Sequence, residues 1–103
     1  MGFQAIQGRK VGPATISSGI AVVASLLDLN AVQQNEVAGA DISVQNADIY
    51  TRYDGINDIS SAGLLIKNGT LFRFDNRADL LRAIFWRAGS ADAAVVIQPL
   101  KGI

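Results

Sequence analysis

The segment DISVQNADIYTRYDG, residues 41–55, decides the fold class of this chain. Ile42 and Val44 alternate with polar residues, and the same alternation resumes over residues 49–53. A period of two is typical of β-strands that have one buried face and one exposed face. Asn46-Ala47 offers a tight turn between the two runs, so the segment predicts a β-hairpin that ends at the final Asp-Gly.

A second pair of β-rich runs follows in LLIKNGTLFRF, residues 64–74. Its central Asn68-Gly69 is the strongest short hairpin signal in the chain, because type I′ turns need positive φ at both central residues. We therefore predict a hairpin with strands at 64–67 and 70–74. Residues 82–89 and 91–100, on either side of Gly89-Ser90, predict a terminal hairpin in the same way.

The N-terminal half of the chain predicts shorter elements. Residues 15–17 and 20–23 are β-rich and are separated by Ser18-Gly19, which fits two short strands or one strand with a bulge. Residues 28–40 are polar and show no sustained helical stripe. We expect a loop there, with a helical turn at about 31–34.

One short helix is expected late in the chain, where Asn76 and Asp79 form a variant of the capping box and predict a helical turn near 77–81. The many short strands predict an all-β fold, an antiparallel β-sandwich of jelly-roll-like type. For 103 residues we expect an N-terminal arm over 1–12 and a single sandwich domain over 13–103.

Composition narrows the function classes. The chain has no Cys and no His, so it lacks thiolate chemistry and the commonest general base and metal ligand. We expect no enzyme activity, no catalytic residue, no metal site and no cofactor, with a pair of converging carboxylates for glycoside hydrolysis as the enzymatic alternative. The longest apolar run, residues 20–27, is too short to span a bilayer, and the N-terminus lacks the apolar core of a secretory signal. We expect no membrane partner and synthesis in a cytosol.

Formal charge is zero overall but is unevenly distributed along the chain. Residues 11–51 hold four acids and no base, whereas residues 52–103 hold seven bases and five acids. Identical subunits could use this asymmetry to meet, with an acidic edge against a basic one.

Two polar patterns admit a binding function, each with a simpler interpretation. Asp54, Asn57 and Asp58 offer oxygen ligands for calcium, but they lack the spacing of an EF-hand loop and fit turn chemistry better. Four arginines interleave with aromatic residues in the manner of single-strand nucleic-acid binders: Arg73, Arg77, Arg82 and Arg87. Zero net charge opposes phosphate binding, so we expect no nucleic acid. We also expect no small-molecule substrate.

Phe85 and Trp86 are adjacent, and in a strand they must point to opposite faces. We predict Phe85 in the core, because it shares parity with Leu81 and Ala83, and Trp86 outward. Trp86 then packs under a loop or makes a contact outside the domain, where Trp is enriched at interface hot spots.

The last 60 or so residues resemble a group of small tailed-phage virion proteins. The strands of that group carry a pattern close to I-x-V-x-x-A-x-I-R-Y-R-x-D-G, followed by a Ser/Thr-containing loop, a Leu-Leu pair, a Gly turn and F-R-A-I-R. The corresponding residues of this chain are Ile42, Val44, Ala47, Ile49, Tyr50, Thr51, Arg52, Tyr53, Asp54, Gly55, Gly63, Leu64, Leu65, Gly69, Arg82, Ala83 and Ile84.

The resemblance implies a structural component of a phage particle, made in the cytoplasm of a bacterial host and located on the capsid surface. The expected role is a capsid decoration or cement protein that binds across subunits of the major capsid protein as a homo-oligomer, a trimer. A neck or tail accessory protein is the nearest alternative. A carbohydrate-binding β-sandwich that uses Tyr50, Tyr53 and Trp86 as a stacking platform is the second.

A decoration protein needs apolar and charged surface residues rather than reactive groups. The two terminal segments supply apolar side chains that suit such contacts. The candidate interface residues are Phe3, Ile6, Tyr50, Arg52, Arg82, Trp86, Arg87 and Ile103.

Overall fold

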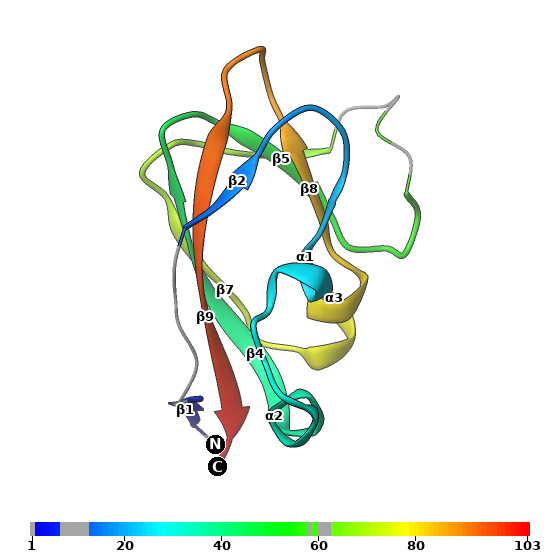
Figure 1. Cartoon of the computed structure of the whole chain (residues 1–103), viewed down its shortest axis with the longest axis vertical. Helices are drawn as coiled ribbons and strands as arrows, with labels where there is room; N and C mark the ends of the chain where they lie inside the picture. Colours follow the sequence, from blue (N-terminus) through cyan, green and yellow to red (C-terminus); the bar gives the residue numbers. More distant parts are fainter. Residues whose placement is uncertain (1, 7–12, 58, 60–62) are drawn as a thin grey trace.

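The computed structural model describes residues 2–6, 13–57, 59 and 63–103, and it shows two antiparallel β-sheets packed into a sandwich (Figure 1). The first sheet has the strand order β1-β9-β4-β7, with β2 also paired to β9. Its strands are β1 (Phe3–Ala5), β2 (Pro13–Ile16), β4 (Val37–Gln45), β7 (Leu71–Phe74) and β9 (Ala93–Gly102). The second sheet, in the order β3-β8-β5-β6, contains β3 (Ala21–Val22), β8 (Ile84–Arg87), β5 (Ile49–Arg52) and β6 (Leu64–Ile66). The predicted all-β antiparallel sandwich is confirmed.

The strands pair in a nested order, with the loop between β5 and β6 at the centre (concentric pairing). β5 pairs with β6, β4 with β7, β3 with β8, and both β2 and β1 with β9. Tyr50 thus lies opposite Leu65, Ala40 opposite Phe74, and Phe3 opposite Gly102. The first half of the chain therefore runs beside the second half, as in one long hairpin that is folded over into two layers.

This topology contradicts the three predicted short hairpins. β4 and β5, β6 and β7, and β8 and β9 follow one another in sequence but lie in different sheets. Turns do form at these positions: Asn46 and Gly69 have positive φ, and the Thr70 N–H donates to the Lys67 carbonyl at 3.1 Å. The predicted type I′ turn at Asn68-Gly69 is wrong, because Asn68 lacks the positive φ that this turn type needs. A hairpin within one sheet and a tight crossover between two facing sheets need the same sequence pattern. In both, two segments of alternating apolar and polar residues flank a turn. The local pattern is the same for both.

Three short helices connect the strands. α3 (Arg77–Arg82) confirms the predicted helical turn, and Asn76 caps it by accepting from the N–H groups of Ala78 and Asp79. α2 (Ala31–Glu36) begins at the predicted turn after an Asn30 capping box. Residues 37–40 were expected in the same loop, and that prediction is wrong, because β4 already begins at Val37. α1 (Val23–Leu26) follows the short β3 directly.

The hydrophobic core lies between the sheets and is closed at one end by two helices. Ile42 lies opposite Ile97, and Val44 lies opposite Val95, in the first sheet. Phe85 of β8 is fully buried, as predicted. Val23 of α1 and Leu80 of α3 are also fully buried, and the two helices pack together below the second sheet (Figure 1). No helix among the described residues is long and apolar enough to cross a membrane.

The described part of the N-terminal segment belongs to the first sheet. β1 pairs with the end of β9, and the Ile6 N–H donates to the Pro99 carbonyl at 3.0 Å. Ile6 is buried in the core cluster, so it is not the exposed contact residue that we expected. Ile103, by contrast, is exposed, and its N–H donates to the Gly2 carbonyl at 3.2 Å.

The acidic first half and the basic second half of the chain form ion pairs with each other within one molecule. Concentric pairing brings the acidic first half beside the basic second half, and it forms the ion pairs Asp41–Arg73 at 2.6 Å, Asp48–Lys67 at 3.5 Å and Glu36–Lys101 at 4.0 Å. These acids are therefore engaged inside one copy. Because all three pairs are partly solvent-exposed, each contributes little to stability.

Asp48 joins two of the crossover turns and gives a testable pH dependence. Its carboxylate accepts from the Asn68 N–H at 2.7 Å, and this bond, with the charge of Lys67, lowers the pKa of Asp48 below the ordinary value of 3.8. A carboxyl group with a lowered folded-state pKa stabilises the fold above its unfolded pKa and loses this contribution as pH falls through the folded value.

We expect Asp48→Asn to unfold at a lower urea concentration than the natural chain above pH 3.8, with a difference that shrinks as the pH is lowered below that value. The effect is small and decreases with salt, because the side chain is partly exposed. A difference that stays constant through the acid range would show that the Asp48 charge is not coupled to folding.

Candidate functional site

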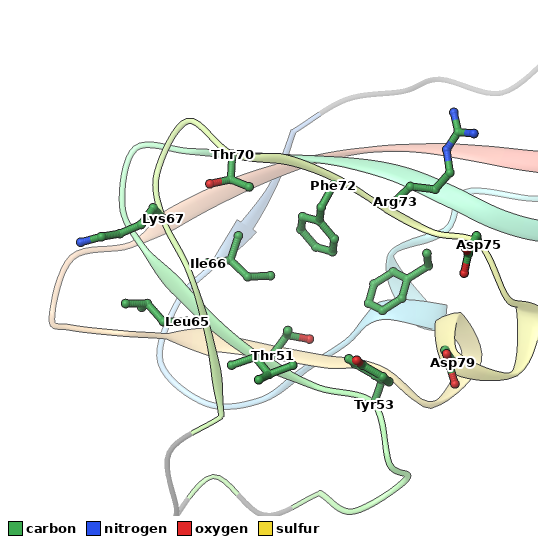
Figure 2. A pocket seen from close by; sticks show the side chains of 12 residues that line it. Thr51, Tyr53, Leu65, Ile66, Lys67, Thr70, Phe72, Arg73, Asp75 and Asp79 are labelled. Atoms are coloured by element: carbon green, nitrogen blue, oxygen red, sulfur yellow. The ribbon is translucent and has the colours of Figure 1, made fainter.

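The two sheets end on the same side of the molecule, at β6 and β7. β6 is the last strand of the second sheet and β7 is the last strand of the first. The turn at residues 67–70 joins them, and from this turn the two strands run apart, each along the edge of its own sheet (Figure 2). Among the described residues, no further strand continues either sheet beyond this edge. Its backbone groups are therefore available for pairing.

A hollow of about 420 Å³ lies between these two edge strands. Figure 2 shows Ile66 and Phe72 pointing into it, with Thr51 at its base, while Lys67 and Arg73 point away. Lys67 marks the turn end of the hollow, and Asp75 and Asp79 mark the other end. We call β6, β7 and this hollow the open edge.

Exposed apolar side chains gather around the open edge. Leu71 is 71% exposed, Leu64 is 57% exposed and Leu65 is 49% exposed. Of the eleven large apolar side chains exposed among the described residues, four line the hollow or belong to its edge strands: Tyr53, Leu64, Leu65 and Leu71. Natural sheets usually protect an edge with charges, Pro or a bulge, and contiguous exposed apolar residues mark interaction sites.

The base of the hollow is largely apolar, and the Thr51 hydroxyl there is hydrogen-bonded within the chain. The rings of Tyr53 and Phe72 each meet Phe74 edge to face, at centroid distances of 5.8 and 5.5 Å. The Thr51 Oγ1 donates to the Ile84 carbonyl at 2.9 Å. The open edge therefore offers apolar surface and backbone groups without a strand partner to an occupant.

The aromatic residues of the predicted carbohydrate platform do not form one surface. Tyr50 and Trp86 stack on the outer face of the second sheet, with ring centroids 5.7 Å apart. Trp86 lies outside the core cluster, as the parity argument predicted, but it is only 6% exposed. Gly63 of the β5–β6 loop packs on its ring so closely that a Cβ there would lie 2.5 Å from Trp86 Cη2. Tyr53 lies instead against Phe74.

Four other candidate interface residues, Arg52, Arg82, Arg87 and Phe3, have partners within the chain. Arg52 pairs with Asp54 at 2.7 Å, Arg82 with Asp79 at 3.3 Å, and Arg87 with Asp92 at 2.7 Å. Phe3 is half-buried, and the Arg73 guanidinium lies 5.2 Å above its ring. Tyr50, Arg52 and Trp86 lie on the second sheet, whereas Phe3 lies on the first, so the candidate interface residues are divided between the two sheets.

The predicted interface set missed the open edge, although a signal for it was present. Leu64 and Leu65 are adjacent in a strand, so one of them must face away from the core. Residues 64–74 were predicted to form one hairpin, and the sequence did not predict where its strands stand in a sheet.

The two polar patterns of the sequence are the candidate calcium ligands Asp54, Asn57 and Asp58 and the four arginines. In the described residues, Asp54 and the arginines form hydrogen bonds or ion pairs within the fold. The side chain of Arg52 and the Ile56 N–H hydrogen bond to the Asp54 carboxylate and lower its pKa, which is turn chemistry. Asp58 lies outside the described residues. No group of three or more acidic side chains that could hold a metal ion is found in the described part of the chain.

The four arginines of the nucleic-acid pattern all have partners within the chain. Arg73, Arg82 and Arg87 pair with acids, and Arg77 donates to the carbonyls of Gln34 and Val37 at 2.8 and 2.7 Å. The pattern therefore does not form a stripe of unpaired cations, and the open edge is the better candidate site.

The chain matches no protein-family model, no curated protein and no solved structure.

Proposed function

We propose that this chain is a structural protein of a tailed-phage particle, a decoration protein that binds across subunits of the major capsid protein. The open edge is the observation that carries the adhesive part of this proposal. Exposed Leu residues on two unpaired strands favour contact with other protein chains. The phage assignment comes from the resemblance of residues 42–97.

We extend the proposal to the fold and infer a jelly roll. Rolling up one long hairpin of eight strands gives the pairs β2–β9, β3–β8, β4–β7 and β5–β6, split between two sheets, and these are the pairs present here. Jelly rolls occur in viral capsid proteins and in lectins. The architecture supports a place on a virus particle and also fits a lectin.

The physical requirements of a decoration protein agree with this molecule. Such a protein stabilises a shell through many identical weak contacts, which add up by multivalency. Zero net charge leaves little long-range repulsion between neighbouring copies on the shell. A rigid sandwich with one apolar open edge provides a contact that every copy can repeat.

Co-sedimentation with empty shells of the phage that encodes the chain tests the proposal. We expect saturable binding to shells, with no steep salt dependence on oligonucleotides and no change in Trp86 fluorescence with glycans. Binding to isolated tails but not to shells would favour the neck or tail role. Failure to bind either particle would contradict the proposed function.

A further inference from the structure

We propose that β7 accepts an extended segment of the shell protein as an additional strand of the first sheet, and that an apolar side chain of this segment fills the hollow. The segment spans at least the four residues of β7. This inference rests on the proposed function, and it names the chemistry of the partner segment at the same open edge.

The backbone of β7 has hydrogen-bonding groups that point out of the first sheet. The Thr70 carbonyl accepts from the Val44 N–H of β4 at 2.9 Å. Because the C=O and N–H of a trans peptide point in opposite directions, the Leu71 N–H points away from β4. Residues two apart in a strand direct their backbone groups to the same side, so Arg73 repeats this orientation, whereas Phe72 between them faces β4. β7 therefore offers the backbone of Leu71 and Arg73 to an added strand.

The edge of the second sheet offers fewer such groups. The Asp48 carbonyl accepts from the Ala88 N–H at 3.2 Å, so the Ile49 N–H, in the same peptide as that carbonyl, points toward β6. Ile49 lies opposite Ile66, so the two end residues of β6 face β5 and Leu65 alone of this strand faces outward. We therefore assign the added strand to β7, which has two such residues.

The hollow determines which side chains the added strand carries. A residue directly opposite Phe72 points its side chain to the same face as Phe72, which is the face of the hollow (Figure 2). This side chain would lie against Ile66 and Phe72, so we expect it to be large and apolar. Its two neighbours lie opposite Leu71 and Arg73 and point to the outer face of the sheet. The partner segment therefore alternates, with its apolar residues toward the hollow.

The two ends of the hollow differ in charge. Lys67 at the turn end has a side chain that is 72% exposed, and its pair with Asp48 is long at 3.5 Å. Asp75 and Asp79 stand at the opposite end. A segment with an acidic residue at the turn end and a basic residue at the other end is complementary to this arrangement.

Proline substitution tests the backbone contact. Leu71→Pro removes the outward N–H of β7 but no hydrogen bond to β4, and edge strands tolerate Pro at such positions. Leu71→Ala removes the side chain and keeps the N–H. We expect Leu71→Pro to bind empty shells about 10-fold more weakly than Leu71→Ala does, because a partner carbonyl loses its donor. Urea unfolding followed by the fluorescence of Trp86 checks that both variants fold.

The same two substitutions at Leu65 are the matched control. Leu65 also directs its N–H outward, but from the edge of the second sheet. We expect Leu65→Pro and Leu65→Ala to bind shells with similar affinity. If the natural chain binds shells and Leu71→Pro binds as well as Leu71→Ala does, strand addition is overturned and the proposed function stands. If the natural chain does not bind shells, both proposals are overturned.

Hydrogen exchange tests the added strand without a substitution. In the free protein, the amides of Leu71 and Arg73 should exchange faster than that of Phe72, which faces β4. On empty shells, we expect both amides to exchange at least about 10-fold more slowly, as measured by NMR after release from the shells. Amides that exchange as fast on shells as in the free protein would overturn strand addition, even if Leu71→Pro does not fold.

Removing one carboxylate tests the charge of the partner segment. Asp75→Ala is expected to weaken shell binding about 3-fold. Asp92→Ala removes the same charge from a residue that does not line the hollow, and it should leave the affinity unchanged. Equal affinities for the two variants would overturn the basic residue assigned to that end of the segment.

Discussion

Replacing Phe85 by alanine is expected to lower the free energy of unfolding by about 3–5 kcal/mol. Phe85 is fully buried in the second sheet, and its ring meets those of Phe72 and Phe74 from the first sheet, at centroid distances of 6.3 and 6.5 Å. Truncation therefore removes apolar contacts and opens a cavity where the two sheets meet. Urea unfolding followed by the fluorescence of Trp86, the single tryptophan, measures the loss.

Two further variants show whether the loss comes from the contact between the sheets. Phe85→Leu keeps most of the apolar volume and should destabilise much less than alanine does. Leu71→Ala removes an exposed side chain of β7 and should change the stability by no more than about 0.5 kcal/mol. A loss below about 1 kcal/mol for Phe85→Ala would contradict the core described above.

Gly39→Ala is expected to destabilise the protein by about 2–4 kcal/mol. The register of β4 against β9 shifts between Val37 and Gly39, which marks a β-bulge. At this bulge a Cβ on Gly39 would overlap the backbone carbonyl oxygen of Phe74 on β7. A backbone atom cannot swing away as a flexible side chain can, so β7 would have to move.

Gly89→Ala is the matched control for the bulge variant. Gly89 lies between β8 and β9, and no atom would come within 4 Å of an added Cβ. This substitution should leave the urea midpoint almost unchanged. Equal stabilities for the two alanine variants would show that β4 and β7 do not approach each other at Gly39.

The local alternation of apolar and polar residues predicted which residues form strands better than it predicted which strands pair with each other. Ile42 and Val44 lie in a strand with one buried face, as their alternation indicated, and Asn76 caps a helix. Residues 37–40 did not show the pattern, because Ala and Gly have low β-propensity and Gly39 is needed for the bulge. Their strand is imposed by pairing with β9, which is distant in sequence.

The candidate site depends on information that a local pattern does not contain. That β6 and β7 are both edge strands follows from the concentric pairing of the whole chain, and the turn at Asn68-Gly69 is compatible with either topology. Trp86 was correctly expected to face away from the core. Its burial depends on the close approach of Gly63 from another part of the chain.

Heating empty shells with the natural chain and with two charge variants tests the adhesive role of the open edge most directly. Leu71→Asp places a charge on the open edge, and Val32→Asp places one on an equally exposed apolar position of α2. We expect the natural chain and Val32→Asp to raise the melting temperature of the shells, and Leu71→Asp to leave it unchanged. Shells that melt at the same temperature with the natural chain as without it, or that Leu71→Asp stabilises as well as the natural chain does, would contradict this account.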